Sequence, residues 1–494
     1  MKKYILAIDQ GTTSSRAILF DHNGRYTYSA QREVKCLFPK EGWVEEDPLE
    51  LWVSVVDVVN EVLIKANASW DDIDSIGLTN QRETTIIWDK KTGKPIYNAV
   101  VWQSRQSVEI CDRLVDKKEF IHSKTGLLIN PYFSASKIRW ILDNVPGAQE
   151  KAENGELLFG TVDSWIIYKM SNGKVHATDS TNASRTLLYN IFTLEWDKEL
   201  CKLFNIPMNM LPEVKYSVDD YGPASYFTKE VHVLGVAGDQ QASLFGHTCF
   251  KPGESKNTYG TGCFMLMNIG DKPILSNKGL LTTIAWSSKL GIRYALEGSV
   301  FVGGSAIQWL RDGLKIVKDA PDSENVAGKC EDCDGIYLVP AFVGLGTPYW
   351  DDEVRGAAFG LTRATTKYQL VRATLEGIAY QVKDVFDIMK EESGIDIKSL
   401  QVDGGATANN ILMQFQSDIC RIEIKKPQVV ETTALGVAYF AGLKSNYFKN
   451  IEEIVATHDY QAQYSPQMCE KRALEKCHGW SVAVQAARAF KPTK

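Results

Sequence analysis

The sequence predicts an α/β protein with two large domains, each built from a mixed sheet flanked by helices. Its 494 residues exceed the usual capacity of one hydrophobic core. The chain opens with two apolar strands joined by a tight turn and then enters a helix, an order typical of helices packed on a mixed sheet. In the second half, an apolar strand that runs into an Asp-Gly turn at Asp403 resembles the strand that ends at Asp9. This repeat predicts two related domains that hold one ligand between them.

The composition favours a cytoplasmic protein that binds a small molecule. The formal net charge is -6 and the isoelectric point is near 5.8, which disfavours nucleic acid or an anionic membrane as a partner. The first residues form too short an apolar run for a signal peptide, and no run approaches a membrane span. The 10 cysteines are scattered, as expected of reduced thiols. The one close pair, Cys330 and Cys333, is assigned to a surface loop without a known role.

The first hairpin, residues 5–20, has the features of a phosphate-binding turn. Gly11 allows a backbone geometry in which main-chain N–H groups face an anion. Asp9 ends the first strand and can hold a magnesium ion through water, because Mg2+ prefers one or two carboxylates beside substrate phosphates. An ordinary hairpin with polar turn residues is the alternative. The side chains that add hydrogen-bond donors are Thr12, Thr13, Ser14 and Arg16.

The next elements add a candidate substrate pair. Residues 26–34 alternate as a third antiparallel strand, and Asp47 and Pro48 start a helix with one apolar face. Residues 75–88 are two apolar strands joined by a turn that places Arg82 beside Glu83. This pair could bind the hydroxyl groups of a polyol, because it offers both donors and acceptors. The alternative is a solvated surface ion pair.

Aromatic side chains occur in two loops, at Trp102 and at Tyr132, where they either wall the apolar face of a substrate or cap the core. Gly238 then permits a turn from a strand into a helix that begins at Asp239. Asp239 is either a helix cap or a carboxylate that takes the proton of a substrate hydroxyl.

The second half contains glycine-rich segments suited to a nucleotide. Residues 257–264 form a glycine-rich hairpin, and Gly303 and Gly304 open a helix whose N-terminus suits an anion or a polar base edge. Residues 367–392 predict a long helix that belongs to the core. The predicted division is an N-terminal domain at 1–250, a C-terminal domain at 251–443 and a helical tail at 444–494 that packs on the second domain.

Five motifs, in this order and spacing, closely resemble the FGGY carbohydrate kinases, and among them those that phosphorylate glycerol. The motifs are Asp-Gln-Gly-Thr-Thr-Ser-Ser-Arg, Asn-Gln-Arg-Glu-Thr, Gly-Asp-Gln-Gln, Tyr-Gly-Thr-Gly-Cys-Phe and Val-Asp-Gly-Gly-Ala. The resemblance covers residues 4–443. It implies the actin-like ATPase fold, in which two ribonuclease-H-like domains flank an interdomain cleft. Glycerol and phosphate would bind mainly to the first domain and the nucleotide to the second.

The resemblance also implies the reaction and the roles of single residues. ATP and glycerol would give ADP and sn-glycerol 3-phosphate, the first step of glycerol catabolism, with Mg2+ near Asp9 and a homodimer or homotetramer as the assembly. Asp239 would be the base, with Asp9 and Arg16 as further catalytic groups. The implied glycerol ligands and walls are Arg82, Glu83, Trp102, Tyr132, Asp239, Gln240 and Phe264. The implied nucleotide contacts are Thr12, Thr13, Ser14, Arg16, Thr261, Gly304, Gln308, Gly405 and Asn409.

Two other functions stay open at this point. A kinase of the same fold could act on xylulose, ribulose or gluconate, although Arg82 and Glu83 with crowding aromatics favour a three-carbon substrate. A non-catalytic actin-like protein would be a filament or a sugar-sensing repressor. A repressor is disfavoured by the acidic charge and by the strand that starts at residue 4. Residues 216–230 lack the glycine-rich loop with which some relatives bind a sugar bisphosphate, so we do not expect that regulation. The chain carries neither a P-loop nor a Rossmann motif.

Overall fold

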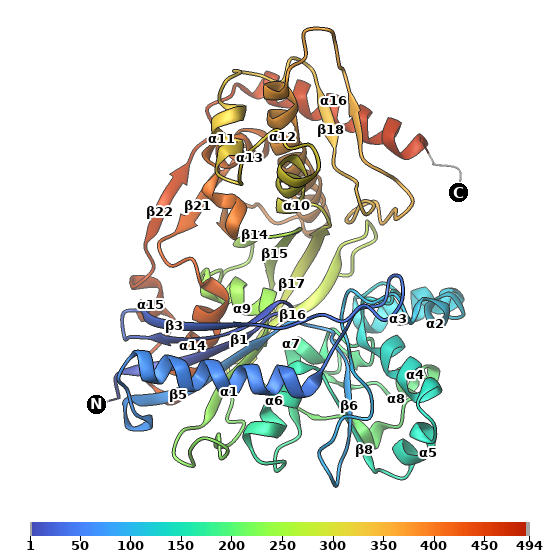
Figure 1. The fold of residues 1–494 in the computed structure, drawn as a ribbon, viewed down its shortest axis with the longest axis vertical. Coiled ribbons are helices and arrows are strands. Elements are labelled where there is room, and N and C mark those ends of the chain that lie inside the picture. Colours follow the sequence, from blue (N-terminus) through green and yellow to red (C-terminus); the bar gives the residue numbers. More distant parts are fainter. Residues whose placement is uncertain (1, 491–494) are drawn as a thin grey trace.

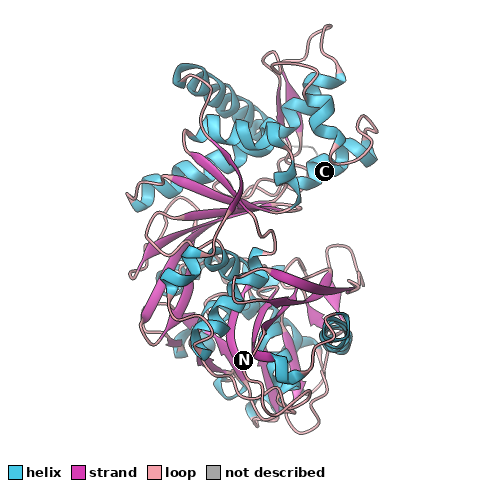
Figure 2. Cartoon of the chain, turned by 90° about the vertical axis from the view of Figure 1, so that its left-hand side faces the viewer, coloured by secondary structure: helices cyan, strands magenta, loops and turns pink. Residues whose placement is uncertain are grey.

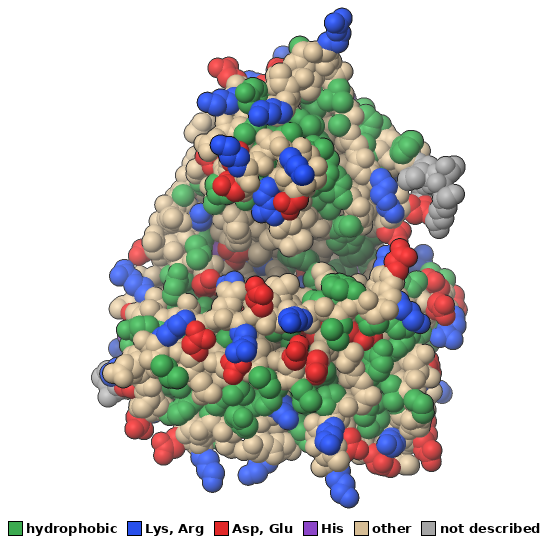
Figure 3. Space-filling view, viewed as in Figure 1, with side chains coloured by type: hydrophobic (Ala, Val, Ile, Leu, Met, Phe, Trp, Pro, Cys, Tyr) green, Lys and Arg blue, Asp and Glu red, His purple; other side chains and the backbone are tan. Residues whose placement is uncertain are grey.

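The computed structural model describes residues 2–490, which form two lobes joined at a waist (Figures 1 and 2). Each lobe contains a central sheet with helices packed on it. The space-filling view shows a recess between the lobes (Figure 3). In residues 2–490, we find no helix with the length and apolar character needed to cross a membrane.

The first lobe is built on a five-stranded sheet in which three antiparallel strands are followed by two parallel ones. In spatial order the strands are β3 (Tyr26–Glu33), β2 (Ser14–Phe20), β1 (Tyr4–Gln10), β5 (Ile73–Asn80) and β13 (Val233–Gly238). Helix α1 (Pro48–Lys65) covers one face, and its apolar stripe is buried there. The helix starts as predicted, since the Asp47 side chain accepts a hydrogen bond from the Leu49 N–H group at 2.8 Å.

The second lobe repeats this topology in a seven-stranded sheet. Strands β17 (Gly291–Val300), β15 (Cys263–Gly270) and β14 (Ser255–Tyr259) are antiparallel, and β20 (Ser399–Asp403) and β21 (Glu423–Pro427) continue parallel to β14. Strands β16 (Leu281–Ser288) and β22 (Tyr460–Tyr464) extend the two edges. Two ribonuclease-H-like sheets are therefore confirmed.

The strands that are equivalent in the two sheets are not the ones that the sequence repeat predicted. The strand equivalent to β1 is β14, so the turn at residues 260–262 corresponds to the turn after Asp9. Asp403 ends β20, which is the equivalent of β5. The sequence comparison confused the two because β14 and β20 are adjacent parallel strands, and each ends in a glycine-containing turn at the same edge of the sheet.

Short elements complete the lobes. In Figure 1 most of the helices α2–α8 lie beside the first sheet, and α10–α13 cover the second. The first lobe also contains β4 (Glu45–Glu46), η1 (Trp70–Asp72), β6 (Ile86–Asp89), β7 (Ala99–Val100), α2 (Val108–Asp112), η2 (Val115–Lys117), α3 (Lys118–Thr125), α4 (Ser134–Asn144), α5 (Ala148–Glu153), β8 (Leu157–Gly160), α6 (Val162–Met170), β9 (Ala177–Asp179), α7 (Ser180–Ala183), β10 (Tyr189–Asn190), β11 (Glu195–Trp196), α8 (Lys198–Leu203), η3 (Met208–Met210) and β12 (Glu213–Lys215). The second lobe also contains α10 (Gly304–Gln308), the π-helix η4 (Trp309–Gly313), α11 (Asp322–Ala327), β18 (Tyr337–Val339), β19 (Ala357–Phe359), α12 (Lys367–Ser393), η5 (Gly405–Ala408), α13 (Asn410–Cys420) and α16 (Glu470–Ala489). Helix α15 (Ile451–Ala456) lies beside the first sheet, where Glu453 pairs with His22 (Figure 1).

Two helices at the waist pack against each other and join the lobes. They are α9 (Asp239–Gly246) and α14 (Thr432–Ser445). A Cβ atom on Gly246 would lie 2.0 Å from the carbonyl oxygen of Thr432, and one on Gly436 would lie 1.9 Å from that of Ala242. Glycine is therefore required on both helices, because any larger residue would push them apart.

Helix α14 lies on the first sheet, against β5, β13 and β1, although the sequence placed its residues in the second domain. The order of elements along the chain did not predict that α14 packs on the first sheet, because α14 follows a strand of the second sheet. The tail differs too: it contributes β22 to the second sheet, and the Tyr447 hydroxyl donates to the Lys3 carbonyl of the first lobe at 2.7 Å. The limits at residues 250 and 443 stay a prediction. The long helix α12 forms as predicted.

Candidate active site

The first hairpin forms the predicted turn, but Gly11 has a different role in it. Its N–H group donates to the carbonyl oxygen of Ser14 at 2.9 Å and therefore does not face an anion. Gly11 also lacks the positive φ that would require glycine. Thr13 is exposed at the tip, and Ser14 is half-buried. The Thr12 hydroxyl accepts a hydrogen bond from the Trp102 indole at 2.9 Å, which joins the turn to the aromatic loop.

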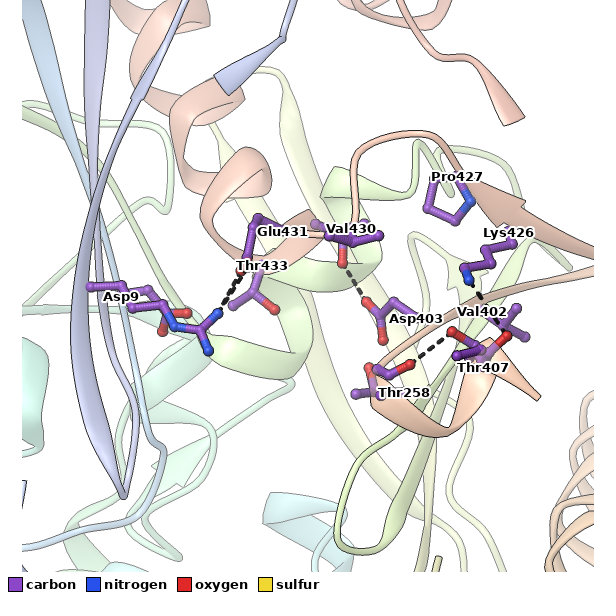
Figure 4. A pocket seen from close by; sticks show the side chains of 15 residues that line it. Asp9, Thr258, Val402, Asp403, Thr407, Lys426, Pro427, Val430, Glu431 and Thr433 are labelled. Atoms are coloured by element: carbon purple, nitrogen blue, oxygen red, sulfur yellow. Dashed lines mark hydrogen bonds and ion pairs between the residues drawn. The ribbon is translucent and has the colours of Figure 1, made fainter. Parts of the chain in front are cut away.

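A cavity of about 480 Å³ lies beside this hairpin, between the two lobes. Asp9 and Glu431 lie at one side of it, and Asp403, Thr407 and Lys426 line the other (Figure 4). The remaining lining residues are Arg16, Thr258, Val402, Gly404, Gly405, Ala408, Pro427, Val430, Thr432 and Thr433. The hairpin at Asp9 and the glycine turn after β20 therefore face one space, as the sequence predicted for a ligand held between two domains.

Asp9 and Arg16 lie opposite each other on β1 and β2. Burial raises the pKa of Asp9 to about 7, while the nearby Arg16 charge acts in the opposite direction. Arg16 Nη1 lies 2.8 Å from Oε2 of Glu431, so the guanidinium group is already paired. Residues 2–490 contain no group of three or more His, Cys, Asp or Glu side chains that could hold a metal ion. Asp9, a half-buried carboxylate at the cavity, fits Mg2+, which takes one or two carboxylates together with substrate phosphates.

The predicted pair of Arg82 and Glu83 is buried, so it is not a solvated surface pair. Arg82 makes a bidentate ion pair with Glu297, at 2.6 Å from Nη1 and 2.9 Å from Nη2. Its Nε lies 3.2 Å from Oδ1 of Asp239 and 3.9 Å from Oε1 of Glu83. Glu83 accepts from Nε of Arg185 at 2.6 Å. Two arginines and three carboxylates therefore form one network.

Asp239 is the first residue of α9 and lies at the edge of this network, where it pairs with Arg82. Its side chain is 31% exposed, whereas that of Arg82 is 2% exposed, so this carboxylate is the most accessible group of the network. The predicted turn from strand to helix forms at Gly238, whose backbone angles are ordinary, so the turn itself does not require glycine. Glycine is needed because a Cβ atom would lie 2.7 Å from the Arg82 side chain.

Gln240 connects the network to the cavity through a buried lysine. Its Oε1 accepts from Nζ of Lys256, and the same Nζ donates to the Thr258 hydroxyl at 2.9 Å. Thr258 lines the cavity. Burial lowers the pKa of Lys256 to about 8, while the carboxylates of Asp403 and Asp239 act in the opposite direction.

The aromatic side chains lie beside the network. The rings of Trp102 and Tyr132 meet edge to face, with centroids 5.5 Å apart. The Arg185 guanidinium carbon lies 5.8 Å from the centre of the Tyr132 ring. Phe264 pairs with Ser299 on β17, two residues from Glu297, so Phe264 and Glu297 lie on the same face of the second sheet. Trp102 and Tyr132 thus form an aromatic pair beside Arg185, and the role of the three aromatic residues as a substrate wall stays a prediction.

The predicted nucleotide residues are spread over three segments. Gly405 lines the cavity. Thr261 lies beside the start of α10, since its carbonyl oxygen accepts from Ser305; Gly304 is the first residue of this helix, and Gln308 is exposed at its end. None of these three lines the cavity. The Asn409 side chain caps α13 through the Leu412 N–H group at 3.0 Å and donates to Ser323 at 3.1 Å. Both of its polar atoms thus have structural partners.

Four residues of the site were missed from the sequence: Arg185, Glu297, Lys256 and Glu431. Arg185 and Glu297 lie outside the motif stretches that were interpreted, and Lys256 directly precedes the hairpin at residues 257–264. A charged residue within an otherwise buried strand is a usable signal, because a buried charge needs a partner. This signal applies to Glu297 and Lys256.

Comparison with known proteins agrees with this geometry. Residues 4–246 match the N-terminal domain of the FGGY family of carbohydrate kinases, and residues 255–445 match its C-terminal domain. Glycerol kinase from Geobacillus sp. (strain WCH70) is 56% identical over 99% of this chain and 100% of its own length. Glycerol kinase from Bacillus mycoides (strain KBAB4) is 57% identical over the same shares.

Solved structures give the same result. The crystal structure of Plasmodium falciparum glycerol kinase with ADP is 36% identical and has a TM-score of 0.93 over 98% of both chains. Xylulose kinase from Lactobacillus acidophilus is 21% identical and has the same fold, with a TM-score of 0.89 over 99% of this chain and 98% of its own. The chain belongs to the FGGY family of carbohydrate kinases.

Proposed function

We propose that this protein transfers the γ-phosphoryl group of ATP to a terminal hydroxyl of glycerol, which gives sn-glycerol 3-phosphate and ADP. Full-length relatives at 56% and 57% identity carry the name glycerol kinase, which supports this substrate. The observation that carries the proposal is the buried pair of Arg82 and Glu83 beside the accessible Asp239. Asp239 in turn lies near enough to Asp9, at the cavity, for their charges to interact.

Glycerol would bind beside Asp239, at the edge of the network of ion pairs. The carboxylates of Glu83 and Asp239 accept hydrogen bonds from its hydroxyl groups, and Arg82 and Gln240 donate to their oxygens. Trp102, Tyr132 and Phe264 would enclose the C–H side of the molecule. Crowding by these three aromatic side chains would favour a three-carbon substrate over a ketose or an aldonic acid.

Asp239 would hold the attacking hydroxyl and accept its proton as the new P–O bond forms. Phosphoryl transfer has a loose transition state, so the protein acts mainly by aligning the two oxygens and neutralising charge. Thr12, Thr13 and Ser14 would donate to the phosphates, and Arg16 would turn to them from Glu431. A bound Mg2+ would supply further positive charge to the phosphates, and Asp9 is the residue that would hold it.

The nucleotide would occupy the cavity between Asp9 and Gly405. The crystal structure of Plasmodium falciparum glycerol kinase with ADP supports nucleotide binding in this fold. Thr261, Gly304, Gln308 and Asn409 do not line the cavity, so their contact with the nucleotide remains a prediction. A cytoplasmic location, a homodimer or homotetramer and the division at residues 250 and 443 remain predictions.

The test is ADP release with glycerol, xylulose, ribulose and gluconate, each with and without Mg2+, followed by identification of the product. We expect magnesium-dependent turnover with glycerol, at a kcat/KM at least tenfold above that with the longer substrates. Preferred turnover of a five- or six-carbon substrate would assign the protein to another activity of its family. Sedimentation with ATP and no turnover on any polyol would favour a filament-forming protein.

A further inference from the structure

Two buried side chains outside the assigned substrate residues hold the Arg82 and Glu83 turn from both sides. They are Arg185, in the loop after α7, and Glu297, in the middle of β17 of the second sheet. We propose that Arg185 and Glu297 are positioning residues that fix Arg82 and Glu83 for polyol binding. This inference rests on the proposed function, because it assigns these two residues a part in the same substrate site.

Arg185 contacts both carboxylates of the network and two aromatic rings beside them. Its side chain is fully buried, its Nε lies 2.6 Å from Oε1 of Glu83, and its Nη2 lies 3.1 Å from Oε1 of Glu297. Its guanidinium carbon also lies 5.8 Å from the centre of the Tyr132 ring and 5.3 Å from that of Phe133. The planar guanidinium group of Arg185 therefore holds the Glu83 carboxylate and packs against the aromatic rings at the same time.

Glu83 needs such support because its backbone is unusual. Its φ angle is +60°, in the left-handed region that residues other than glycine rarely adopt. A residue stays in this region only when its surroundings determine its position. The Glu83 carbonyl oxygen accepts from the Ser134 hydroxyl at 3.1 Å, and its carboxylate accepts from Arg185. Main chain and side chain are thus held by separate partners.

Glu297 performs the same task for Arg82 from the other lobe. Its two carboxylate oxygens accept hydrogen bonds from the two terminal nitrogens of Arg82, at 2.6 Å and 2.9 Å. Burial alone would raise the pKa of Glu297, but the charges of Arg185 and Arg82 hold it at about 2. The carboxylate is therefore ionised at every working pH. Because Glu297 belongs to the second sheet, the polyol site in the first lobe is completed by the second.

Two variants separate positioning from structural support: Arg185→Lys keeps the charge and loses the planar fork, and Glu297→Gln keeps the shape and loses the charge. The matched control is Arg139→Lys. Arg139 is also a buried arginine of the first lobe, but it pairs with Asp143 at 2.9 Å and the Asn205 carbonyl at 2.5 Å. For each variant we would measure KM for glycerol, KM for ATP and the shift of the unfolding temperature on adding glycerol.

We expect the KM for glycerol to rise on the order of 10- to 100-fold in both site variants, the range for a disturbed charged hydrogen bond. The KM for ATP should change less than twofold, and the glycerol-induced shift of the unfolding temperature should be lost. Arg139→Lys should leave all three unchanged. If one site variant does not fold, the other decides.

An unchanged KM for glycerol, or an equal rise in both KM values, would overturn the positioning role. Absence of glycerol phosphorylation in the unmodified protein would instead overturn the proposed function.

Discussion

Nη1 of Arg16 lies 2.8 Å from Oε2 of Glu431, so the first hairpin is joined to the residue that precedes helix α14. Both residues line the cavity assigned to the nucleotide. Glu431 accepts only from Nη1 of Arg16, so a phosphate group would either share the guanidinium group with this carboxylate or replace it. We expect the carboxylate to compete with the phosphate group for Arg16.

Glu431→Gln should strengthen ADP binding in the presence of Mg2+ by about two- to fivefold, the range for a partly exposed ion pair. Titration calorimetry measures the change. Asp57→Asn is the control, because Asp57 forms a similar pair with Arg32 at 2.6 Å on the surface of the first lobe. Weaker ADP binding in Glu431→Gln would show that Glu431 helps the nucleotide instead.

Gly436→Ala should destabilise the protein by roughly 1–3 kcal/mol or more, the range for an overpacked core. The added Cβ atom would lie 1.9 Å from the Ala242 carbonyl and would separate α14 from α9. Gly405→Ala is the control, since a Cβ atom there meets nothing within 4 Å. Urea unfolding gives the free energies, and equal stability of the two variants would contradict the close contact of the helices.

The sequence could predict the hairpin, the start of α1, the extent of α12 and the stretches around Arg82 and Asp239, because each depends on local patterns of apolar and capping residues. It could not predict that Glu297 reaches Arg82 across the lobes, since that contact depends on how two sheets meet. The place of α14 on the first sheet was missed for the same reason. Asn409 was assigned to the nucleotide, yet its side chain caps α13, a use that its position before a helix already permitted.

Asp163 should make the stability of the protein depend on pH. Burial, with a smaller effect of the Asp179 charge, raises its pKa to about 7 in the folded protein. The unfolded carboxyl group has an ordinary pKa near 4. The folded state thus holds the proton more tightly, so the contribution of Asp163 to stability is present below about pH 4 and is lost as the pH rises to about 7.

Asp163→Asn removes this dependence, because the amide does not ionise. Relative to the unmodified protein, the variant should gain roughly 1–3 kcal/mol of unfolding free energy between pH 5 and pH 8. Urea unfolding at both pH values checks this. Asp116→Asn, at an exposed carboxylate, should show no such gain. The same difference between Asp163→Asn and the unmodified protein at both pH values would contradict the assignment.

The central claim is that Asp239 accepts the proton of the glycerol hydroxyl that attacks ATP. The most direct measurement compares single-turnover formation of glycerol 3-phosphate, followed by phosphorus NMR, in the unmodified protein and in Asp239→Asn. The asparagine keeps the size of the side chain and cannot accept the proton. We predict a rate lower by about two to four orders of magnitude, the usual range for a general base, while ADP binding stays unchanged. A rate close to that of the unmodified protein would contradict the account.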